Sequence, residues 1–270
     1  MNKSIDYELK LFMFIGRHLP AIPHVTGIDN RILKPIYLRK KRCPVIVNVL
    51  DFRMILDPSE CVDGNLLFHP QLYDREEIKY LRGNLREGDV FLDIGANIGF
   101  YSLVVSKIVG QAGRVVSIEA DPQIYGQLVK NITLNNMKNI KAVNLGVSDK
   151  DEILMLGVCT IGNRGGNSFL REGNKKVEVQ CRSLTDIILS EGIERVKAIK
   201  IDIEGFEYRV LERFFYEAPD TLYPEIFIIE HFPMLNKDAG GNSLGLLVKN
   251  DYKIIDRNGS NYIMRRKTKE

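Results

Sequence analysis

Short apolar runs and amphipathic stretches alternate along the chain from about residue 89 onward. The runs are rich in Val, Ile, Leu and Phe, as in buried strands, and the stretches between them have helical spacing. The runs lie at 90–94, 114–119, 140–143, 196–201 and 226–229. Strands that alternate with helices predict βαβ units and a parallel sheet, and therefore a Rossmann-like α/β fold.

Local signals mark where several elements begin and end. Asp121 and Pro122 predict the start of a helix, because an acidic cap precedes a proline at the first helical position. An Asn-Gly pair at 258–259, between two apolar runs, predicts a C-terminal hairpin. Between the third and fourth runs, residues 152–158 and 177–181 have the composition of strands.

The first 85 residues differ in texture from the rest. We expect an amphipathic helix over Tyr7 to Leu19, a proline-rich segment, and two β-like runs at 45–50 and 52–56. The apolar run 11–15 is too short to span a bilayer, and no small-residue cleavage site follows it. These features predict a cytoplasmic protein with an N-terminal cap at 1–85 and an α/β domain at 86–270.

Composition narrows the class of partner. The chain has 38 basic and 35 acidic residues, a formal charge of +3, which is too small to indicate a nucleic-acid partner. The four cysteines form no CxxC pair, so neither a zinc site nor a disulfide framework is indicated. Basic patches at 39–42 and 265–269 are best interpreted as solvated surface, and docking near anionic lipid or a phosphorylated carrier is the alternative.

The most informative segment is the loop from Asp93 to Gly99, between a buried strand and a helix. In a doubly wound sheet, ligands bind beyond the carboxyl ends of the strands. A dinucleotide fingerprint requires Gly-x-Gly-x-x-Gly, but Asn97 stands where its second glycine would be, so a pyrophosphate cradle is incomplete. The Asp93 carboxylate would repel a pyrophosphate, yet it can accept hydrogen bonds from a ligand ammonium. S-adenosylmethionine, which has an ammonium and no phosphate, fits this loop better than NAD.

Glu119 lies at the end of the second predicted strand, about twenty residues past Gly99. An acidic side chain there can accept both ribose hydroxyls of an adenosine ligand. NAD and S-adenosylmethionine share that ribose, so Glu119 supports an adenosine ligand without choosing between them.

Four ordered motifs resemble the FkbM-type methyltransferases. They are the run from Gly88 to Ser102, Glu119-Ala120-Asp121-Pro122, the run from Asn144 to Asp149, and Lys200-Ile201-Asp202-Ile203-Glu204-Gly205-Phe206-Glu207. The resemblance implies a class I S-adenosylmethionine-dependent methyltransferase fold, with strand order 3-2-1-4-5-7-6 and strand seven antiparallel. It also implies O-methylation of a hydroxyl, often on a sugar of a glycolipid, surface polysaccharide or natural product.

The same resemblance assigns residues to the cofactor. The glycine loop and the residue that takes the ribose form one group, and a later segment lies near the adenine. The set is Asp93, Gly95, Ala96, Asn97, Gly99, Glu119 and Ala120, with Gly146, Val147 and Ser148 near the adenine.

Candidate catalytic residues lie at the ends of two strands that are neighbours in the implied order. Strand four delivers Asp202 and Glu204, and strand five delivers Glu230 and His231. In one mechanism, His231 or Asp202 removes the hydroxyl proton directly. In the other, Asp202, Glu230 and His231 hold magnesium or manganese, which lowers the pKa of the hydroxyl. We favour the metal-free route, and for His231 a purely structural role at the strand end is an equal alternative.

Competing functions remain open from the sequence alone. An NAD(P)-dependent oxidoreductase would use the same adenosine-binding edge, and a methyltransferase for nucleic acid or protein would share the fold. A non-catalytic cofactor-binding partner in glycan assembly is the third alternative. The expected acceptor is a hydroxyl of a saccharide or lipid-linked saccharide, with weak peripheral membrane contact. Residues 163–167 are expected to form an ordinary exposed loop, with an acceptor lid as the alternative.

Overall fold

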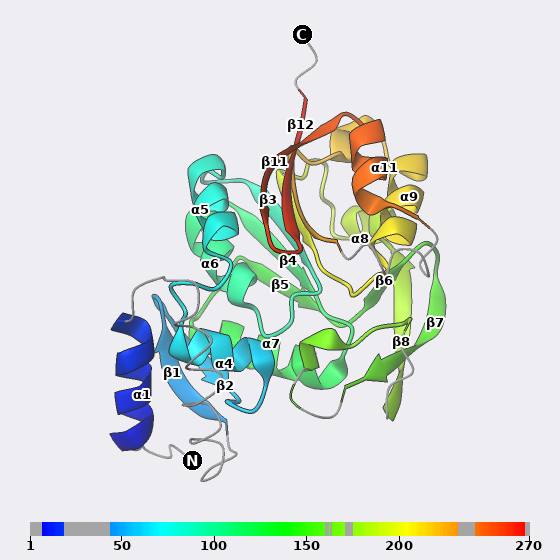
Figure 1. The fold of residues 1–270 in the computed structure, drawn as a ribbon. Coiled ribbons are helices and arrows are strands. Elements are labelled where there is room, and N and C mark those ends of the chain that lie inside the picture. Colours follow the sequence, from blue (N-terminus) through cyan, green and yellow to red (C-terminus); the bar gives the residue numbers. More distant parts are fainter. Residues whose placement is uncertain are drawn as a thin grey trace.

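The computed structural model describes residues 7–18, 44–159, 162, 164–170, 175–231 and 241–267. Its centre is a seven-stranded sheet with the order β11-β12-β10-β9-β3-β4-β5 (Figure 1). The strands are β3 (Val90–Ile94), β4 (Arg114–Ile118), β5 (Ile140–Val143), β9 (Ala198–Ile201), β10 (Ile226–Glu230), β11 (Tyr252–Asn258) and β12 (Asn261–Arg266). The strand pairs are parallel from β5 to β10, whereas β12 is antiparallel to both of its neighbours. The predicted α/β class and the implied strand order are therefore confirmed.

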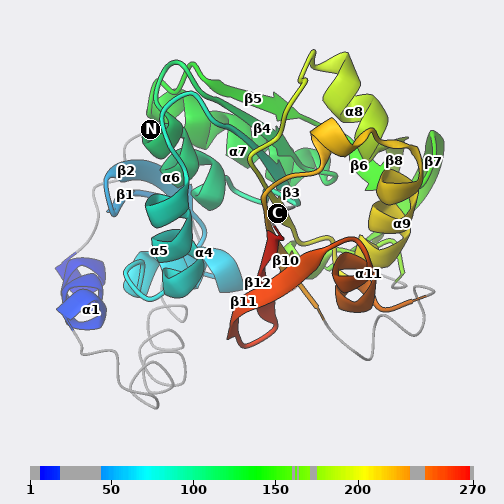
Figure 2. The same cartoon turned by 90° about the horizontal axis from the view of Figure 1, so that it is seen from above.

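Helices cover both faces of this sheet, as Figure 2 shows. One face carries α5 (Arg75–Asn84), α6 (Phe100–Val109) and α7 (Pro122–Leu134), and the other carries α8 (Leu184–Ser190), α9 (Glu207–Glu217) and α11 (Ser243–Lys249). Alternate strand residues enter the two cores, so Phe91 and Ile228 pack in the first and Leu92 and Phe227 in the second. Burial on both faces explains the continuous apolar runs in the sequence.

The N-terminal segment contributes α1 (Tyr7–His18), the strands β1 (Val45–Val49) and β2 (Phe52–Leu56), and α4 (Cys61–Phe68). The helix and the two β-like runs were predicted, whereas α4 and α5 were not. Side-chain amides fasten β2 to α7: Ile55 N donates to Asn131 Oδ1 at 2.7 Å, and Gln127 Nε2 donates to Ile55 O at 2.8 Å. Because Leu9 and Leu66 lie in the same apolar cluster as Phe91, the two predicted parts share a core, and a division at residue 85 stays a prediction.

A second, three-stranded sheet lies beyond the carboxyl end of β4. It consists of β6 (Gly146–Ser148), β8 (Lys175–Ser183) and β7 (Glu152–Val158), in that order. Its apolar cluster, which includes Leu156 and Val179, packs against Ala120 after β4. The short helix η2 (Arg164–Gly166) and its flanking residues bridge back to this sheet, since Ser168 pairs with Gly157. A further short helix, η3 (Asp220–Leu222), precedes β10.

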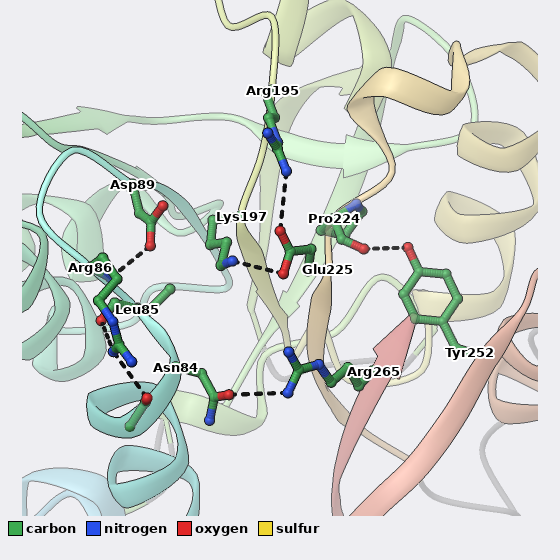
Figure 3. A network of polar contacts seen from close by, with 11 residues as sticks. Asn84, Leu85, Arg86, Asp89, Arg195, Lys197, Pro224, Glu225, Tyr252 and Arg265 are labelled. Carbon is green, nitrogen blue, oxygen red and sulfur yellow. Dashed lines mark hydrogen bonds and ion pairs between the residues drawn. The ribbon is translucent and has the colours of Figure 1, made fainter. Parts of the chain in front are cut away.

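The amino ends of the strands carry an ion-pair network, shown in Figure 3. Glu225 accepts from Lys197 Nζ at 2.7 Å and from Arg195 Nη2 at 3.2 Å. Part of the C-terminal basic patch is used there: Arg265 donates to Asn84 at 3.3 Å, and Arg266 contacts Asp220 at 3.4 Å. Arg265 and Arg266 therefore make contacts within the fold, whereas residues 39–42 and 268–269 lie outside the described residues. Within the described part of the chain, no helix is both long and apolar enough to cross a membrane.

Candidate functional site

The glycine loop is held tightly against the strands on either side of it. Gly95 N and Ala96 N donate to Ile118 O at 3.0 and 2.9 Å, and Asp202 N donates to Ile94 O at 3.1 Å. Gly95 has a φ of +74°, and a Cβ on it would lie 1.9 Å from the carbonyl oxygen of Asp202. Only glycine fits here, because the loop passes directly against the backbone that follows β9.

Glu119 links the loop to the end of β4. Its carboxylate accepts from Asn97 N at 2.8 Å and from Asp121 N at 2.9 Å. Burial raises its pKa to about 7, although these two hydrogen bonds act to lower it. Asn97 itself has a φ of +50°, a conformation that asparagine tolerates. A carboxylate oxygen has more than one acceptor position, so Glu119 can still accept from a ligand hydroxyl.

Two pockets meet at this loop. The first, the loop pocket, holds about 580 Å³ up to the solvent edge and combines the Glu119 carboxylate with an apolar wall that includes Phe169. The second, the carboxylate pocket, holds about 650 Å³. Both are lined by Gly95, Asn97, Gly165, Asp202 and Glu204, so a ligand in one can contact a ligand in the other.

Strand register explains the chemistry of the carboxylate pocket. Asp93 and Lys200 are direct partners across β3 and β9, and Ile228 of β10 pairs with Lys200 on the other side. Asp202 and Glu230 each lie two residues further along their chains, so their side chains share the face of Lys200. Polar groups from three strands therefore converge at one edge of the sheet.

A buried ammonium compensates part of this negative charge. Lys200 is 7% exposed, donates to Asp202 Oδ2 at 3.1 Å and lies over the Tyr101 ring at 5.1 Å. Burial alone would lower its pKa, but the carboxylates of Asp202, Asp93 and Asp74 outweigh that effect and raise it. Lys200 therefore stays protonated at neutral pH.

The Asp202 and Glu230 carboxyl groups form a coupled pair. Burial and the neighbouring Asp202 raise the pKa of Glu230 to about 9, and its carboxyl hydrogen-bonds to that of Asp202. For Asp202, burial is outweighed by Lys200 and Glu230, so its pKa is lowered. Ser260 Oγ donates to Glu230 Oε1 at 2.8 Å. At neutral pH the pair thus holds one proton, which resides on Glu230, and Asp202 is ionised.

Most of the proposed cofactor residues line one of the two pockets. Gly95, Asn97, Glu119, Ala120, Gly146 and Val147 line the loop pocket, and Asp93 and Ala96 line the carboxylate pocket. Gly99 instead begins α6 with a φ of +91°, where a Cβ would lie 2.6 Å from Leu128 Cδ1. Ser148 is buried beneath, with its Oγ donating to Glu152 at 2.7 Å and Asp149 at 3.0 Å, so the structure does not bring it to the pocket lining.

His231 also lies apart from the carboxylates, contrary to the catalytic and metal-binding role considered for it. It follows Glu230 directly, so its side chain takes the opposite face of β10. There its Nδ1 lies 2.9 Å from Ser243 Oγ, and its ring packs edge-on against Tyr262. Burial lowers its pKa. Its structural interpretation as a strand-end residue agrees with these contacts.

Several lining residues were not identified from the sequence. Lys200 stands inside an apolar strand, and its charge at a buried position was the available signal. The loop at 163–167 was expected to be plainly exposed, but Gly165 lines both pockets and Asn167 lines the loop pocket. Tyr73, from the N-terminal segment, lines the carboxylate pocket, and only tertiary packing places it there.

A cation could be held by oxygen atoms of three side chains. Asp202, Glu204 and Glu230 each offer a carboxylate oxygen within 4.8 Å of the others. His231, which was considered as a ligand, is not among them. The Lys200 ammonium already pairs with Asp202, so the negative charge that this set offers to a divalent ion is reduced.

Comparison with known proteins identifies relatives of one kind. Methyltransferase sdnD from Sordaria araneosa is 30% identical over 162 residues, covering 48% of this chain and 61% of that protein. A protein-L-isoaspartate O-methyltransferase from Methanococcus aeolicus is 30% identical over 115 residues, covering 40% and 53%. Hexuronic acid methyltransferase AglP from Haloferax volcanii is 22% identical over 139 residues, covering 52% and 55%. The chain thus spans between half and two thirds of the length of these relatives.

The family itself follows from a longer match. The family model described as the methyltransferase FkbM domain matches residues 93–250, more than half of the chain, beginning at the glycine loop and including all three carboxylates. It is a family of S-adenosylmethionine-dependent enzymes, which confirms the cofactor predicted from the loop. With this match, the strand order and the paired pockets, the chain belongs to the FkbM methyltransferase family.

Proposed function

We propose that the chain is an S-adenosylmethionine-dependent O-methyltransferase that acts on a neutral hydroxyl of a saccharide. The observation that carries this proposal is the Asp202 carboxylate, which accepts from the Lys200 ammonium at 3.1 Å and lines both pockets where they meet. S-adenosylmethionine supplies an electrophilic methyl group. A hydroxyl needs a proton acceptor to react with it at neutral pH, and Asp202 is an acceptor at the shared wall.

The loop pocket fits the adenosine part of the cofactor. Glu119 accepts ribose hydroxyls, and the apolar wall with Phe169 and Leu145 contacts the base. Gly95 lets the loop approach the ligand closely. The net negative carboxylate pocket next to it favours the cationic end of the ligand over a pyrophosphate, which supports S-adenosylmethionine over NAD(P).

The roles within the carboxylate pocket follow from its protonation. Asp202 would accept the hydroxyl proton as the oxygen bonds to the methyl carbon, while the carbon–sulfur bond of the sulfonium breaks and S-adenosylhomocysteine leaves. Lys200 keeps Asp202 ionised beforehand, and Glu230 donates its hydrogen bond to Asp202 and fixes the orientation of that carboxylate. Much of the rate enhancement would come from holding the hydroxyl beside the methyl donor.

The charge of the pocket also bears on the acceptor. A carboxylate acceptor requires no base, and Asp202 and Glu204 would repel it. A sugar hydroxyl is neutral, hydrogen-bonds well to carboxylates and requires a base. The relative AglP, named a hexuronic acid methyltransferase, supports a saccharide as the class of acceptor. Lys200 on Asp202 supports the metal-free route, with Asp202, Glu204 and Glu230 as the residues that would hold magnesium or manganese otherwise.

The test has two stages. Calorimetry with S-adenosylhomocysteine, NAD and NADP on wild type and Glu119→Ala should show adenosylhomocysteine binding that weakens in the variant. Transfer of a labelled methyl group is then measured on hexoses, hexuronic acids and an isoaspartyl peptide, with and without EDTA. Binding of NAD instead, or preferred methylation of the peptide, would contradict the proposal.

The base is tested by a matched pair of variants. Asp202→Asn should lower kcat by about a hundredfold or more, the usual contribution of a general base. Glu230→Gln mimics the protonated acid and should keep most of the activity at neutral pH. If both variants lose activity equally, or if EDTA abolishes transfer, a metal rather than Asp202 activates the hydroxyl.

A further inference from the structure

A third cavity adjoins the carboxylate pocket on the side of the N-terminal segment. It holds about 820 Å³ up to the solvent edge and lies between the β1–β2 turn, the segment before α5, α5 itself and the start of α6. Among the described residues its apolar lining comes from Leu50, Pro70, Tyr73, Ile78 and Phe100. We call this cavity the α5 groove. Figures 1 and 2 both show α5 and α6 side by side there.

On its inner side, two aromatic side chains separate the groove from the carboxylate pocket. Tyr73 and Phe100 line both cavities, and their rings pack edge to face with centroids 5.3 Å apart. The groove therefore adjoins the proposed acceptor site across this aromatic pair, so it is positioned for another part of the same acceptor.

Three cations border this apolar surface. Arg75, Lys79 and Arg82 line the groove, and their spacing of four and three residues places them on one face of α5 over about 10 Å. All three are exposed. Lys79 contacts Glu76 at 3.6 Å, whereas Arg75 and Arg82 have no carboxylate within 4 Å among the described residues. Glu76 and, near Arg82, Asp51 offset part of this charge, but three cations at one apolar groove still make it complementary to an anionic amphiphile.

The helix next to the groove exposes further apolar side chains. Gln71, which lines the groove, donates to the carbonyls of Gly16 and Arg17 at 3.2 and 3.3 Å, so the end of α1 lies at the groove rim. On the outer face of α1, Tyr7 is 79% exposed and Phe14 is 60% exposed. These two side chains add exposed apolar surface to the helix whose end lies at the groove rim.

We propose that the acceptor is a saccharide joined through phosphate to a lipid chain, and that the α5 groove holds its lipid-phosphate portion. The proposal rests on the proposed function, since the sugar hydroxyl then lies beside Asp202. The phosphate pairs with Arg75, Lys79 and Arg82, and the first part of the chain packs against Leu50 and Ile78. The Tyr73–Phe100 pair lies where the sugar meets the phosphate.

The probe is farnesyl phosphate, with farnesol and inorganic phosphate as the two partial ligands, measured by calorimetry on the full chain. We expect farnesyl phosphate to bind at least tenfold more tightly than either partial ligand. In Lys79→Gln/Arg82→Gln its affinity should fall about tenfold, because two ion pairs are lost. The control Lys130→Gln/Lys138→Gln removes two exposed cations that line none of the three cavities and should stay within twofold of wild type.

A second variant tests the apolar surface without threatening the fold. Leu50 has a φ of +50°, a conformation that asparagine adopts more readily than leucine, so Leu50→Asn should fold and weaken farnesyl phosphate binding severalfold. Equal binding of inorganic phosphate would show a free-anion site, and equal binding of farnesol would show a groove indifferent to charge. Either result, or unchanged affinity in both groove variants, overturns the inference.

S-adenosylhomocysteine binding, measured on the same samples, separates this inference from the proposed function. All variants should bind it as wild type does. If wild type binds it and farnesyl phosphate fails the tests above, the groove assignment alone is wrong. If wild type does not bind it, the proposed function fails irrespective of the groove.

Discussion

Replacing Gly95 by alanine tests how the glycine loop and the end of β9 together make the cofactor site. The added Cβ would lie 1.9 Å from the carbonyl oxygen of Asp202, whereas Cβ atoms essentially never approach other atoms closer than 3.0 Å. The loop must therefore move away from Asp202 by about 1 Å or more. That movement strains the hydrogen bonds from Asp202 N to Ile94 O and from Gly95 N to Ile118 O, which are 3.1 and 3.0 Å long.

Gly88→Ala is a matched control. Gly88 also has a positive φ, +89°, but nothing lies within 4 Å of its added Cβ. Its free energy of unfolding should fall only by the cost of a positive φ for alanine, about 1–2 kcal/mol, which lowers Tm by about 2–8 °C. Gly95→Ala has the same cost of a positive φ, and it also loses about 0.5–1.5 kcal/mol for each weakened hydrogen bond. With the strain of the displaced backbone, its free energy of unfolding should fall by about 3–5 kcal/mol in all. Its Tm should fall by about 6–20 °C.

Calorimetric unfolding and S-adenosylhomocysteine titration measure the two effects separately. In Gly88→Ala the ligand affinity should stay within twofold of wild type. In Gly95→Ala it should fall at least about a hundredfold, because the displaced loop carries Asn97 and, through it, one hydrogen bond of Glu119. Equal Tm losses in the two variants together with equal affinities would refute the idea that close approach to Asp202 is what requires glycine at this position.

Three further outcomes follow from the structure. Burial and Asp202 raise the pKa of Glu230 to about 9, so the stability that comes from its protonated form is fully present below the ordinary glutamate pKa and is lost as pH rises through about 9. The Tm of wild type should therefore fall more between about pH 8 and 10 than the Tm of Glu230→Gln. An equal fall in both proteins would mean that another group titrates. Gly126→Ala, inside α7 with nothing within 4 Å of the added Cβ, should raise Tm by about 2–4 °C without changing ligand affinity, and a lower Tm would contradict the open space seen there. His231→Ala should keep kcat within about threefold while lowering Tm by several degrees, since it leaves Ser243 without its buried partner; a hundredfold loss of kcat would return His231 to the catalytic set.

The fold of the α/β domain could be predicted because each local signal agrees with the tertiary structure. The predicted runs at 140–143 and 226–229 coincide with β5 and with most of β10, and Asp121 caps α7 by accepting from Gln123 N at 2.7 Å. The segment from residue 57 to 85 was harder. Helix α4 is buried along Leu66, Leu67 and Phe68, so it lacks the apolar-polar period that identifies a surface helix.

The residues of the candidate site also differ in how far they could be predicted from the sequence. Residues near the glycine loop could be named from sequence because the loop and the strand-end acid are consecutive features of one βαβ unit. The catalytic set depended on which face each strand residue takes, and adjacent residues such as Glu230 and His231 take opposite faces. Knowing that Lys200 pairs with Asp93 fixes that face, since Asp202 and Glu230 then follow by alternation. Strand register, more than residue type, therefore determines which carboxylates can act together, and the face that it selects is the one that the N-terminal segment covers with Tyr73.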